Sequence, residues 1–182
     1  EAYLCGQAVG GATVQILYGD VNPSGHLAET FPVKLEDNPS YVAYQGEGDV
    51  TEYREGVFVG YRYYATKKMP VLFPFGYGLS YTTFAYDALT IDKTSVCVDD
   101  VLKVSVDVAN TGDRAGEEVV QLYIHDLYSV VTRPIKELRD FRRVALAPGE
   151  RKRVEFTLPV ERLGALDENM RFTVEAGDYE IM

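Results

Sequence analysis

The stretch Leu102-Lys-Val-Ser-Val-Asp-Val-Ala109 alternates between an apolar residue and a polar or small one. Successive side chains of a β-strand point to opposite faces, so this pattern predicts a strand with one buried face. Residues 120–124 and 154–158 repeat the pattern, and turn-forming sequences stand between the segments at 110–113 (Asn-Thr-Gly-Asp) and 147–150 (Ala-Pro-Gly-Glu). Several short alternating strands separated by turns predict an antiparallel β-sandwich of about 100 residues.

The last strand of this sandwich is expected at residues 178–182 (Asp-Tyr-Glu-Ile-Met), after the turn at Ala176-Gly177. A sandwich normally uses a few more residues to complete such a strand. The strand is therefore predicted to be truncated. We expect truncation at the other end as well, because Glu1 begins the sequence without a methionine.

The first part of the chain, residues 1–84, has a different sequence pattern. Residues 7–18 are predicted to form a helix, because apolar residues recur at every fourth position and a glycine follows at the expected cap: Ala8, Ala12, Ile16 and Gly19. Gly10 and Gly11 lower helix stability by about 1 kcal/mol each relative to alanine, so we expect them to permit tight packing against a sheet. Residues 1–84 contain too few elements to cover both faces of such a sheet, and upstream sequence or another chain is expected to supply its strands.

The segments that follow this helix are less regular. A short strand is expected from Leu27 to Phe31, a long ordered loop at residues 32–56, and a β-prone segment at residues 56–64. Residues 73–81 mix aromatic residues and glycines too densely for a regular strand and are predicted to form a compact aromatic linker. Within this linker, Gly76 and Gly78 are interpreted as backbone positions where a side chain would collide.

Composition and charge restrict the classes of function. The sequence is 46% hydrophobic and 25% charged, which is typical of a folded globular protein. Residues 1–84 carry 5 Lys+Arg against 9 Asp+Glu, and residues 85–182 carry 13 against 19. Neither part has the basic field that nucleic acid or an anionic membrane attracts, so neither is expected as a partner. The basic stretch Arg133–Arg153 is interrupted by acids and is interpreted as the solvated face of strands.

Cysteine and histidine give no sign of a cofactor. Cys5 and Cys97 are far apart and do not form a disulfide framework, so a reducing compartment, the cytoplasm, is expected. His26 and His125 are isolated, with no neighbours in metal-ligand or nucleophile spacing. No run of 18 apolar residues is present. We therefore expect no metal and no cofactor.

Three motifs occur in order in the first part of the chain: Gly19-Asp-Val-Asn-Pro-Ser-Gly-His-Leu-Ala-Glu-Thr-Phe-Pro32, Tyr53-Arg-Glu-Gly-Val-Phe-Val-Gly-Tyr-Arg-Tyr-Tyr64 and Leu72-Phe-Pro-Phe-Gly-Tyr-Gly-Leu-Ser-Tyr-Thr-Thr-Phe84. Together they resemble the end of the α/β sandwich domain of the family 3 glycoside hydrolases and its junction to a fibronectin type III-like domain. Three later segments resemble that terminal domain: Glu118-Val-Val-Gln-Leu-Tyr-Ile124, Arg133-Pro-Ile-Lys-Glu-Leu138 and Leu146-Ala-Pro-Gly-Glu150. The expected fold is therefore mixed. A partial α/β sandwich remnant, with the long loop and the aromatic linker, occupies residues 1–84, and an antiparallel β-sandwich of fibronectin type III-like (immunoglobulin-like) type occupies residues 85–182.

The resemblance implies a parent enzyme similar to a β-glucosidase, which removes terminal β-linked sugars with retention of configuration. This chemistry needs two carboxyl groups about 5–5.5 Å apart. In the family the nucleophile is an Asp, often followed by Trp, in an N-terminal barrel domain, and this chain contains no Trp. The acid/base Glu of the family lies on a loop that we place before the counterpart of Glu1. The resemblance thus implies no catalytic residue here, leaves substrate-binding residues unknown, and implies as partners the upstream barrel and α/β domains or another chain.

Several residues are nevertheless candidates for a site. The acids Glu47, Glu52 and Glu55 lie in or beside the long loop and are interpreted as solvated or structurally paired, since none matches the acid/base position of the family. His26 stands where the family often has Arg. Four linker aromatics are interpreted as packing residues rather than sugar platforms: Phe73, Phe75, Tyr77 and Tyr81.

A rival interpretation is a stand-alone carbohydrate-binding or interaction module. It requires an exposed planar row of aromatic side chains on one face of the sandwich. The candidates for such a row are scattered along the sequence at Tyr123, Tyr128, Phe141 and Tyr179. The first hypothesis, a non-catalytic region that buttresses the catalytic domains of its enzyme, is therefore favoured.

Overall fold

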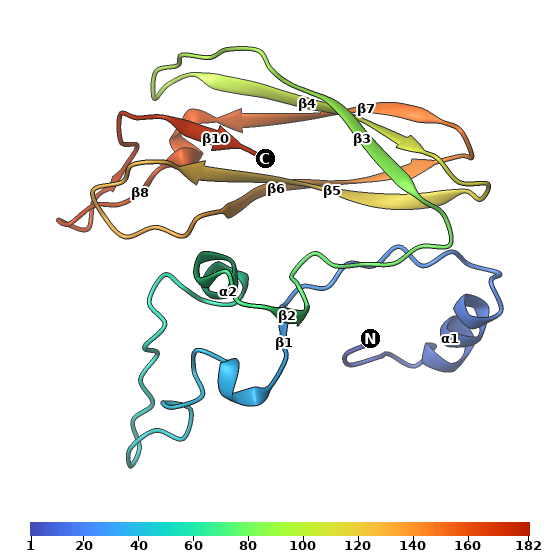
Figure 1. Cartoon of the computed structure of the whole chain (residues 1–182), viewed down its shortest axis with the longest axis horizontal. Helices are drawn as coiled ribbons and strands as arrows, with labels where there is room; N and C mark the ends of the chain where they lie inside the picture. Colours follow the sequence, from blue (N-terminus) through green and yellow to red (C-terminus); the bar gives the residue numbers. More distant parts are fainter.

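The C-terminal part of the protein is a sandwich of two three-stranded antiparallel sheets. The computed structural model describes all residues 1–182. One sheet has the order β3-β4-β7 and the other the order β10-β5-β6, with the strands β3 (Phe84–Ile91), β4 (Val101–Asn110), β5 (Gly116–Asp126), β6 (Glu137–Leu146), β7 (Arg151–Pro159) and β10 (Tyr179–Ile181). Figure 1 shows the two sheets lying face to face. The predicted fold class is confirmed, and the last strand is formed as expected.

The core lies between the two sheets and follows directly from the alternating pattern. Along β4 every second residue is buried, from Leu102 to Asn110, and β5 and β7 repeat this alternation. β4 and β7 pair without a break from Val101↔Pro159 to Ala109↔Arg151. Thirteen buried apolar residues form one cluster, and two of them, Val160 and Leu163, come from the 3-10 helix η2 (Val160–Leu163). A small hairpin of β8 (Ala165–Leu166) and β9 (Phe172–Thr173) follows it.

One buried polar residue closes the end of the core. Asn110 is 1% exposed at the end of β4. Its side-chain nitrogen donates to the carbonyl oxygens of Arg114 at 2.7 Å and Leu146 at 3.1 Å, and its Oδ1 accepts from the Thr82 hydroxyl at 2.6 Å. All of its hydrogen-bonding atoms therefore have partners, which removes the penalty of burying them. The contact with Thr82 also fixes the chain where it enters the sandwich.

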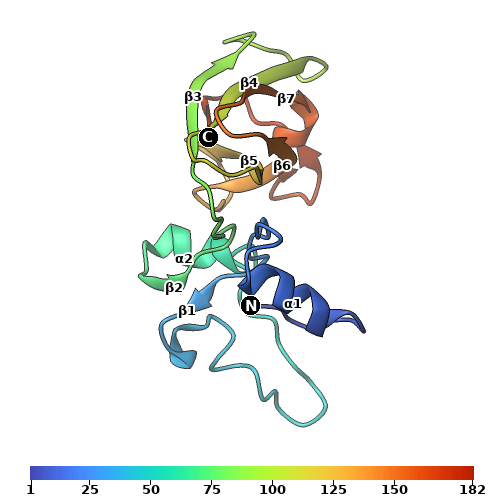
Figure 2. The same ribbon diagram turned by 90° about the vertical axis from the view of Figure 1, so that its right-hand side faces the viewer.

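The N-terminal part contains small elements that lie beneath the sandwich in Figures 1 and 2: α1 (Val9–Leu17), β1 (Phe31–Pro32), the 3-10 helix η1 (Leu35–Asp37), α2 (Tyr61–Lys67) and β2 (Val71–Phe73). The predicted first helix is confirmed, and Gly19 follows it with a φ of 81° while donating its N–H to the Ile16 carbonyl. No residue of α1 is buried. The tight packing expected at Gly10 and Gly11 is not made within this chain, because no atom lies within 4 Å of a Cβ built at either position.

Two predicted strands in this part were wrong. The strand expected at Leu27–Phe31 is reduced to Phe31, which pairs with Phe73 between β1 and β2. The β-prone segment at residues 56–64 instead turns at Gly60, with a φ of 57°, and continues into the helix α2. The physical reason is packing: the ring of Tyr61 lies 4.7 Å from that of Phe75 and 6.0 Å from that of Tyr123, and this tertiary contact outweighs the strand propensity of the tyrosines.

The aromatic linker is compact, as predicted, and joins the two parts. Leu27 and residues 76–77 exchange backbone hydrogen bonds of 2.8 Å. Gly76 has a φ of 79°, and a Cβ there would lie 2.6 Å from the Gln121 side chain. A Cβ on Gly78 would lie 2.6 Å from the carbonyl oxygen of Gly25. Both glycines therefore stand where a side chain would collide, as the sequence indicated.

The interpretation of residues 133–153 as a solvated face was wrong for Arg133. This side chain is 5% exposed and lies 2.8 Å from Asp126 and 2.7 Å from Glu137. Burial disfavours the charged guanidinium, but the hydrogen bond and ion pairs with Glu137 and Asp126 outweigh it and raise the pKa of Arg133. Glu137 also pairs with Arg139 at 3.1 Å and with Arg62 of α2 at 3.8 Å, so this network links α2 to the sandwich.

Candidate functional site

A long loop lies between β1 and α2. This projecting loop, residues 33–60, extends away from the sandwich in both Figure 1 and Figure 2. It contains only the short 3-10 helix η1 and no buried residue. It overlaps the long ordered excursion that the sequence predicts at residues 32–56.

Local hydrogen bonds shape this loop. Asn38 Oδ1 accepts from the Ser40 backbone N–H at 3.0 Å and from the Ser40 hydroxyl at 2.7 Å, which forms a turn directly after η1. Glu47 and Val50 then exchange two backbone hydrogen bonds of 2.8 and 3.2 Å. Gly46 precedes this small hairpin with a φ of 68°, and a Cβ there would lie 2.5 Å from the Val50 carbonyl oxygen. Glycine is therefore required at this tight approach.

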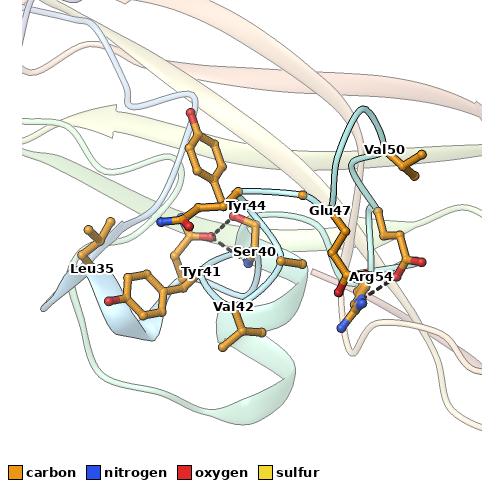
Figure 3. A pocket seen from close by; sticks show the side chains of 13 residues that line it. Leu35, Ser40, Tyr41, Val42, Tyr44, Glu47, Val50 and Arg54 are labelled. Carbon is orange, nitrogen blue, oxygen red and sulfur yellow. Dashed lines mark hydrogen bonds and ion pairs between the residues drawn. The ribbon is translucent and has the colours of Figure 1, made fainter.

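The loop curls around an open cavity of about 990 Å³. Figure 3 shows Tyr41 and Tyr44 on one side of it and Glu47, Val50 and Arg54 on the other. Tyr44 is 77% exposed, and Tyr53 beside the cavity is 88% exposed. Exposed tyrosines provide large, rigid contact surfaces with a polar end, so the loop is suited to contact a sugar ring or a protein surface.

Of the three candidate acids, Glu47 and Glu52 line this cavity and Glu55 does not. Glu52 Oε2 accepts a hydrogen bond from Arg54 Nε at 2.7 Å. Glu47 is held by its backbone bonds to Val50, and the Glu55 carbonyl accepts the N–H of Phe58 at 3.0 Å. The carboxylate of Glu52 therefore faces a guanidinium, the arrangement expected of a structurally paired acid.

The two histidines lie apart, each beside a single acid. His26 Nε2 is 3.6 Å from Glu118, and His125 Nδ1 is 3.5 Å from Glu180. His26 also lies against Gly78 in the junction. No group of three His, Cys, Asp or Glu side chains is close enough to hold a metal ion. Neither α-helix has the length and apolar character needed to cross a membrane.

The linker aromatics pack against one another in the junction. Phe73 lies 6.3 Å from Phe31 and 5.1 Å from Tyr77, measured between ring centroids. Phe75 packs on Tyr61, and the Tyr81 hydroxyl donates to the carbonyl of Ile16 at the end of α1. These contacts agree with the packing role interpreted from the sequence.

Sequence reasoning missed the role of Tyr61. Its hydroxyl accepts the backbone N–H of Leu138 at 2.8 Å, and its ring fills the space between Phe75 and Tyr123. The i, i+3 and i+4 spacing of Tyr61, Tyr64 and Ala65 is the signal that predicts a helix face here, although Gly60 and the strand-prone residues before it obscured it.

Known proteins match this chain over its whole length. Residues 1–81 match the glycosyl hydrolase family 3 C-terminal domain, and residues 118–182 match a fibronectin type III-like domain. The chain is 53% identical over 183 residues to thermostable beta-glucosidase B of Acetivibrio thermocellus, and this match covers 100% of the chain and 24% of the relative. It is 46% identical over 182 residues to a beta-glucosidase of Kluyveromyces marxianus, covering 98% of the chain and 21% of the relative.

The solved structures agree with these sequence matches. The GH3 beta-glucosidase of Bifidobacterium adolescentis superposes with a TM-score of 0.92 at 41% identity, over 100% of this chain and 27% of that one. The Kluyveromyces marxianus enzyme in complex with glucose gives a TM-score of 0.88 at 46% identity, over 95% of this chain and 21% of that one. The chain thus spans about a quarter of the length of these relatives. It belongs to the family 3 glycoside hydrolases and corresponds to their C-terminal region, the end of the α/β domain followed by the fibronectin type III-like domain.

Proposed function

We propose that this chain is the non-catalytic C-terminal region of a retaining β-glucosidase-like enzyme that hydrolyses terminal β-linked sugars, and that it buttresses the catalytic domains. The observation that carries this proposal is the uneven burial of the chain. Of 21 buried residues only Thr30, Tyr64 and Thr82 precede residue 84. The N-terminal part therefore lacks a core of its own, and its apolar side chains need a surface supplied by other domains.

The helix α1 is the main contact that we propose for this surface. Val14 and Leu17 are 51% and 72% exposed, and the backbone at Gly10 and Gly11 is open to close approach. Burying such side chains contributes about 1.5–3 kcal/mol each. The partners are the upstream barrel and α/β domains of the enzyme or another chain, and the β-glucoside substrate is reached only through them.

The projecting loop is proposed to lie near the entrance to the sugar pocket of the assembled enzyme. Its exposed tyrosines and its open cavity support this position, because aromatic side chains in a concave site can contact a sugar and its leaving group. The rival, a stand-alone carbohydrate-binding module, has less support. Tyr123 packs on Tyr61 in the junction, and the Tyr179 hydroxyl donates to the Glu175 carbonyl, so these two rings do not contribute to an exposed row.

A complementation assay tests the proposal. The chain would be mixed with the remainder of the Acetivibrio thermocellus relative, expressed without its matching C-terminal quarter, and hydrolysis of an aryl β-glucoside would be followed. We expect no turnover by the chain alone, because the two carboxyl groups of a retaining enzyme are supplied by the other fragment. We expect activity when the two fragments are combined.

Matched variants sharpen this assay. Ala12→Arg places a charge on the open face of α1 and should reduce complementation, whereas Glu155→Gln on the exposed face of β7 should not. Turnover by the chain alone that disappears in Glu52→Gln or Glu55→Gln would overturn the proposal. Equal complementation by the chain and its Ala12→Arg variant would show that α1 is not the docking surface.

We also propose the cytoplasm as the location of the protein. The support is its cysteine content: Cys5 and Cys97 are both free and exposed, a state that a reducing compartment preserves. Fractionation of the source cells, with an antibody against the sandwich, tests this proposal. Recovery of the protein outside the cytoplasmic fraction would contradict it.

A further inference from the structure

Residues 19–26, called here the connecting segment, lead away from α1 and are attached to the sandwich by polar contacts. Asn22 Nδ2 donates to the Ala115 carbonyl at 2.9 Å, and the Arg114 guanidinium donates to the Gly19 carbonyl. In Figure 1 this segment passes below the sandwich, from α1 toward β1. These two contacts use an amide and a guanidinium, whose charges do not change between about pH 5 and 8. They therefore hold the segment equally well across this range.

His26 is the last residue of the connecting segment, and both of its ring nitrogens lie beside oxygen atoms. Nδ1 is 3.3 Å from the Ser24 carbonyl oxygen, and Nε2 is 3.6 Å from Glu118 Oε1 of β5. The side chains of His26 and Glu118 are each 16% exposed. A neutral imidazole carries one proton, so either tautomer leaves a lone pair facing one of the two oxygens. Only the doubly protonated ring directs an N–H toward both.

The sandwich holds the Glu118 carboxylate in place. The Tyr86 hydroxyl of β3 donates to the same Oε1 at 2.8 Å. Burial and the hydrogen bond to Glu118 raise the pKa of Tyr86, so its hydroxyl stays a donor across the neutral range. The linker faces the His26 ring with Gly78, which has no side chain to titrate and whose Cβ position lies 3.0 Å from the ring carbon Cδ2. A protonated His26 therefore meets a carboxylate that is already positioned.

Two further charged groups near His26 pair with each other. Arg143 of β6 donates to the Ser24 hydroxyl and forms an ion pair with Glu117 of β5. The guanidinium and this carboxylate largely offset each other's charge. Glu118 is therefore the acid that responds to a proton on His26.

We propose that His26 forms a pH-sensitive contact between the connecting segment and the sandwich. Histidine is the side chain whose ordinary titration changes its charge between about pH 5 and 8. Protonation directs an N–H toward Glu118 and creates an ion pair that is largely shielded from solvent. As the pH rises through this range the ring becomes neutral, keeps only one of its two contacts and loses the ion pair. The junction is therefore tighter in mildly acidic than in mildly alkaline solution.

Hydrogen exchange at two backbone amides beside His26 tests this proposal. The Leu27 N–H donates to the Tyr77 carbonyl and the Gly76 N–H donates to the Leu27 carbonyl, both at 2.8 Å, so both amides report opening of the junction. Their protection factors, which correct for the intrinsic pH dependence of exchange, would be measured by NMR at about pH 5.5 and about pH 7.5. We expect protection in the parent chain to be at least about threefold higher at the lower pH.

Four variants separate this ion pair from other causes. His26→Gln and Glu118→Gln each remove one partner, and each should abolish the difference between the two pH values. His26→Arg supplies a charge that does not titrate and should give the same protection at both pH values. Glu180→Gln removes the acid that lies 3.5 Å from the other histidine, His125, and should leave the difference unchanged.

The measurement on the parent chain tests the proposal even where a variant fails to fold. Equal protection of both amides at the two pH values would overturn it. A difference that persists in both His26→Gln and Glu118→Gln would overturn it as well. A difference that Glu180→Gln abolishes would assign the effect to His125 and contradict the proposed role of His26.

Discussion

The sandwich and the N-terminal part are built from the same kinds of residue but bury them very differently. The sandwich, from Phe84 onward, contains 18 of the 21 buried residues, and the first 83 residues contain the other three. Strand alternation lets the sandwich cover its own apolar faces, whereas α1 and the projecting loop present theirs outward. The comparison shows that a high apolar content alone does not make a core; two faces must meet.

Variants that remove an ion pair are expected to show the largest difference in lost stability between the sandwich and the N-terminal part. Arg133→Met leaves the buried carboxylate of Asp126 without a guanidinium and removes the shortest of the three ion pairs of Glu137, so it should destabilise the chain by about 3–5 kcal/mol. The control Arg54→Met removes an exposed pair with Glu52 and should change the unfolding free energy by about 1 kcal/mol or less. Urea unfolding measures both. Similar losses of unfolding free energy in the two variants would show that the ion pairs of Arg133 are not buried.

Leucine truncation tests the apolar contribution directly. Leu158 of β7 is 0% exposed and Leu17 of α1 is 72% exposed. Leu158→Ala should cost about 2–5 kcal/mol, because it removes buried methyl groups and leaves a cavity. Leu17→Ala should be within about 0.5 kcal/mol of the parent chain. If thermal or urea unfolding showed a large loss of stability in Leu17→Ala, α1 would have a packing partner inside this chain.

Substitutions in the junction are expected to destabilise the chain less than substitutions in the core. Gly76→Ala forces an alanine into a φ of 79° against Gln121 and should destabilise the chain by about 1–3 kcal/mol. Gly25→Ala is the matched control, because nothing lies within 4 Å of its Cβ position and its φ is not left-handed. Thermal unfolding of both variants measures the difference. Equal melting temperatures would mean that the linker is a tether rather than a packed joint.

The smallest effect is expected at a surface turn of the sandwich. The Glu150 carboxylate accepts the Ala147 N–H at 2.7 Å and lies 3.2 Å from Lys152, and these contacts lower its pKa below the ordinary 4.5. A lowered folded pKa gives stability that is present above pH 4.5 and is lost as the pH falls through the folded pKa.

Glu150→Gln should therefore melt slightly lower than the parent chain at pH 7, and the difference should close on acidification below the folded pKa of Glu150. Glu155→Gln, an exposed change on β7, is the control and should show no such convergence. A difference between Glu150→Gln and the parent that stayed constant down to pH 2 would contradict the assignment to this carboxylate.

The projecting loop shows where sequence reasoning about the site succeeded and where it stopped. Clusters of turn-forming residues at 32–56 indicated a long ordered loop, and the absence of a motif match indicated structurally paired acids. The Glu52–Arg54 contact agrees with that interpretation. The cavity itself was not predictable, because it depends on how turns at Asn38 and Gly46 combine in space.

The sequence by itself determined the strands β4, β5 and β7, the end of α1 at Gly19 and the family of the chain, because these depend on local period, on a glycine with positive φ, or on ordered motifs. Only the tertiary structure decided the rest. α2 replaces a predicted strand because Tyr61 packs on residues 14 and 62 positions away, Phe75 and Tyr123. Arg133 is buried because Asp126 and Glu137 converge on it across a strand end. Interactions between residues distant in sequence have no local period, and their energies decide these features.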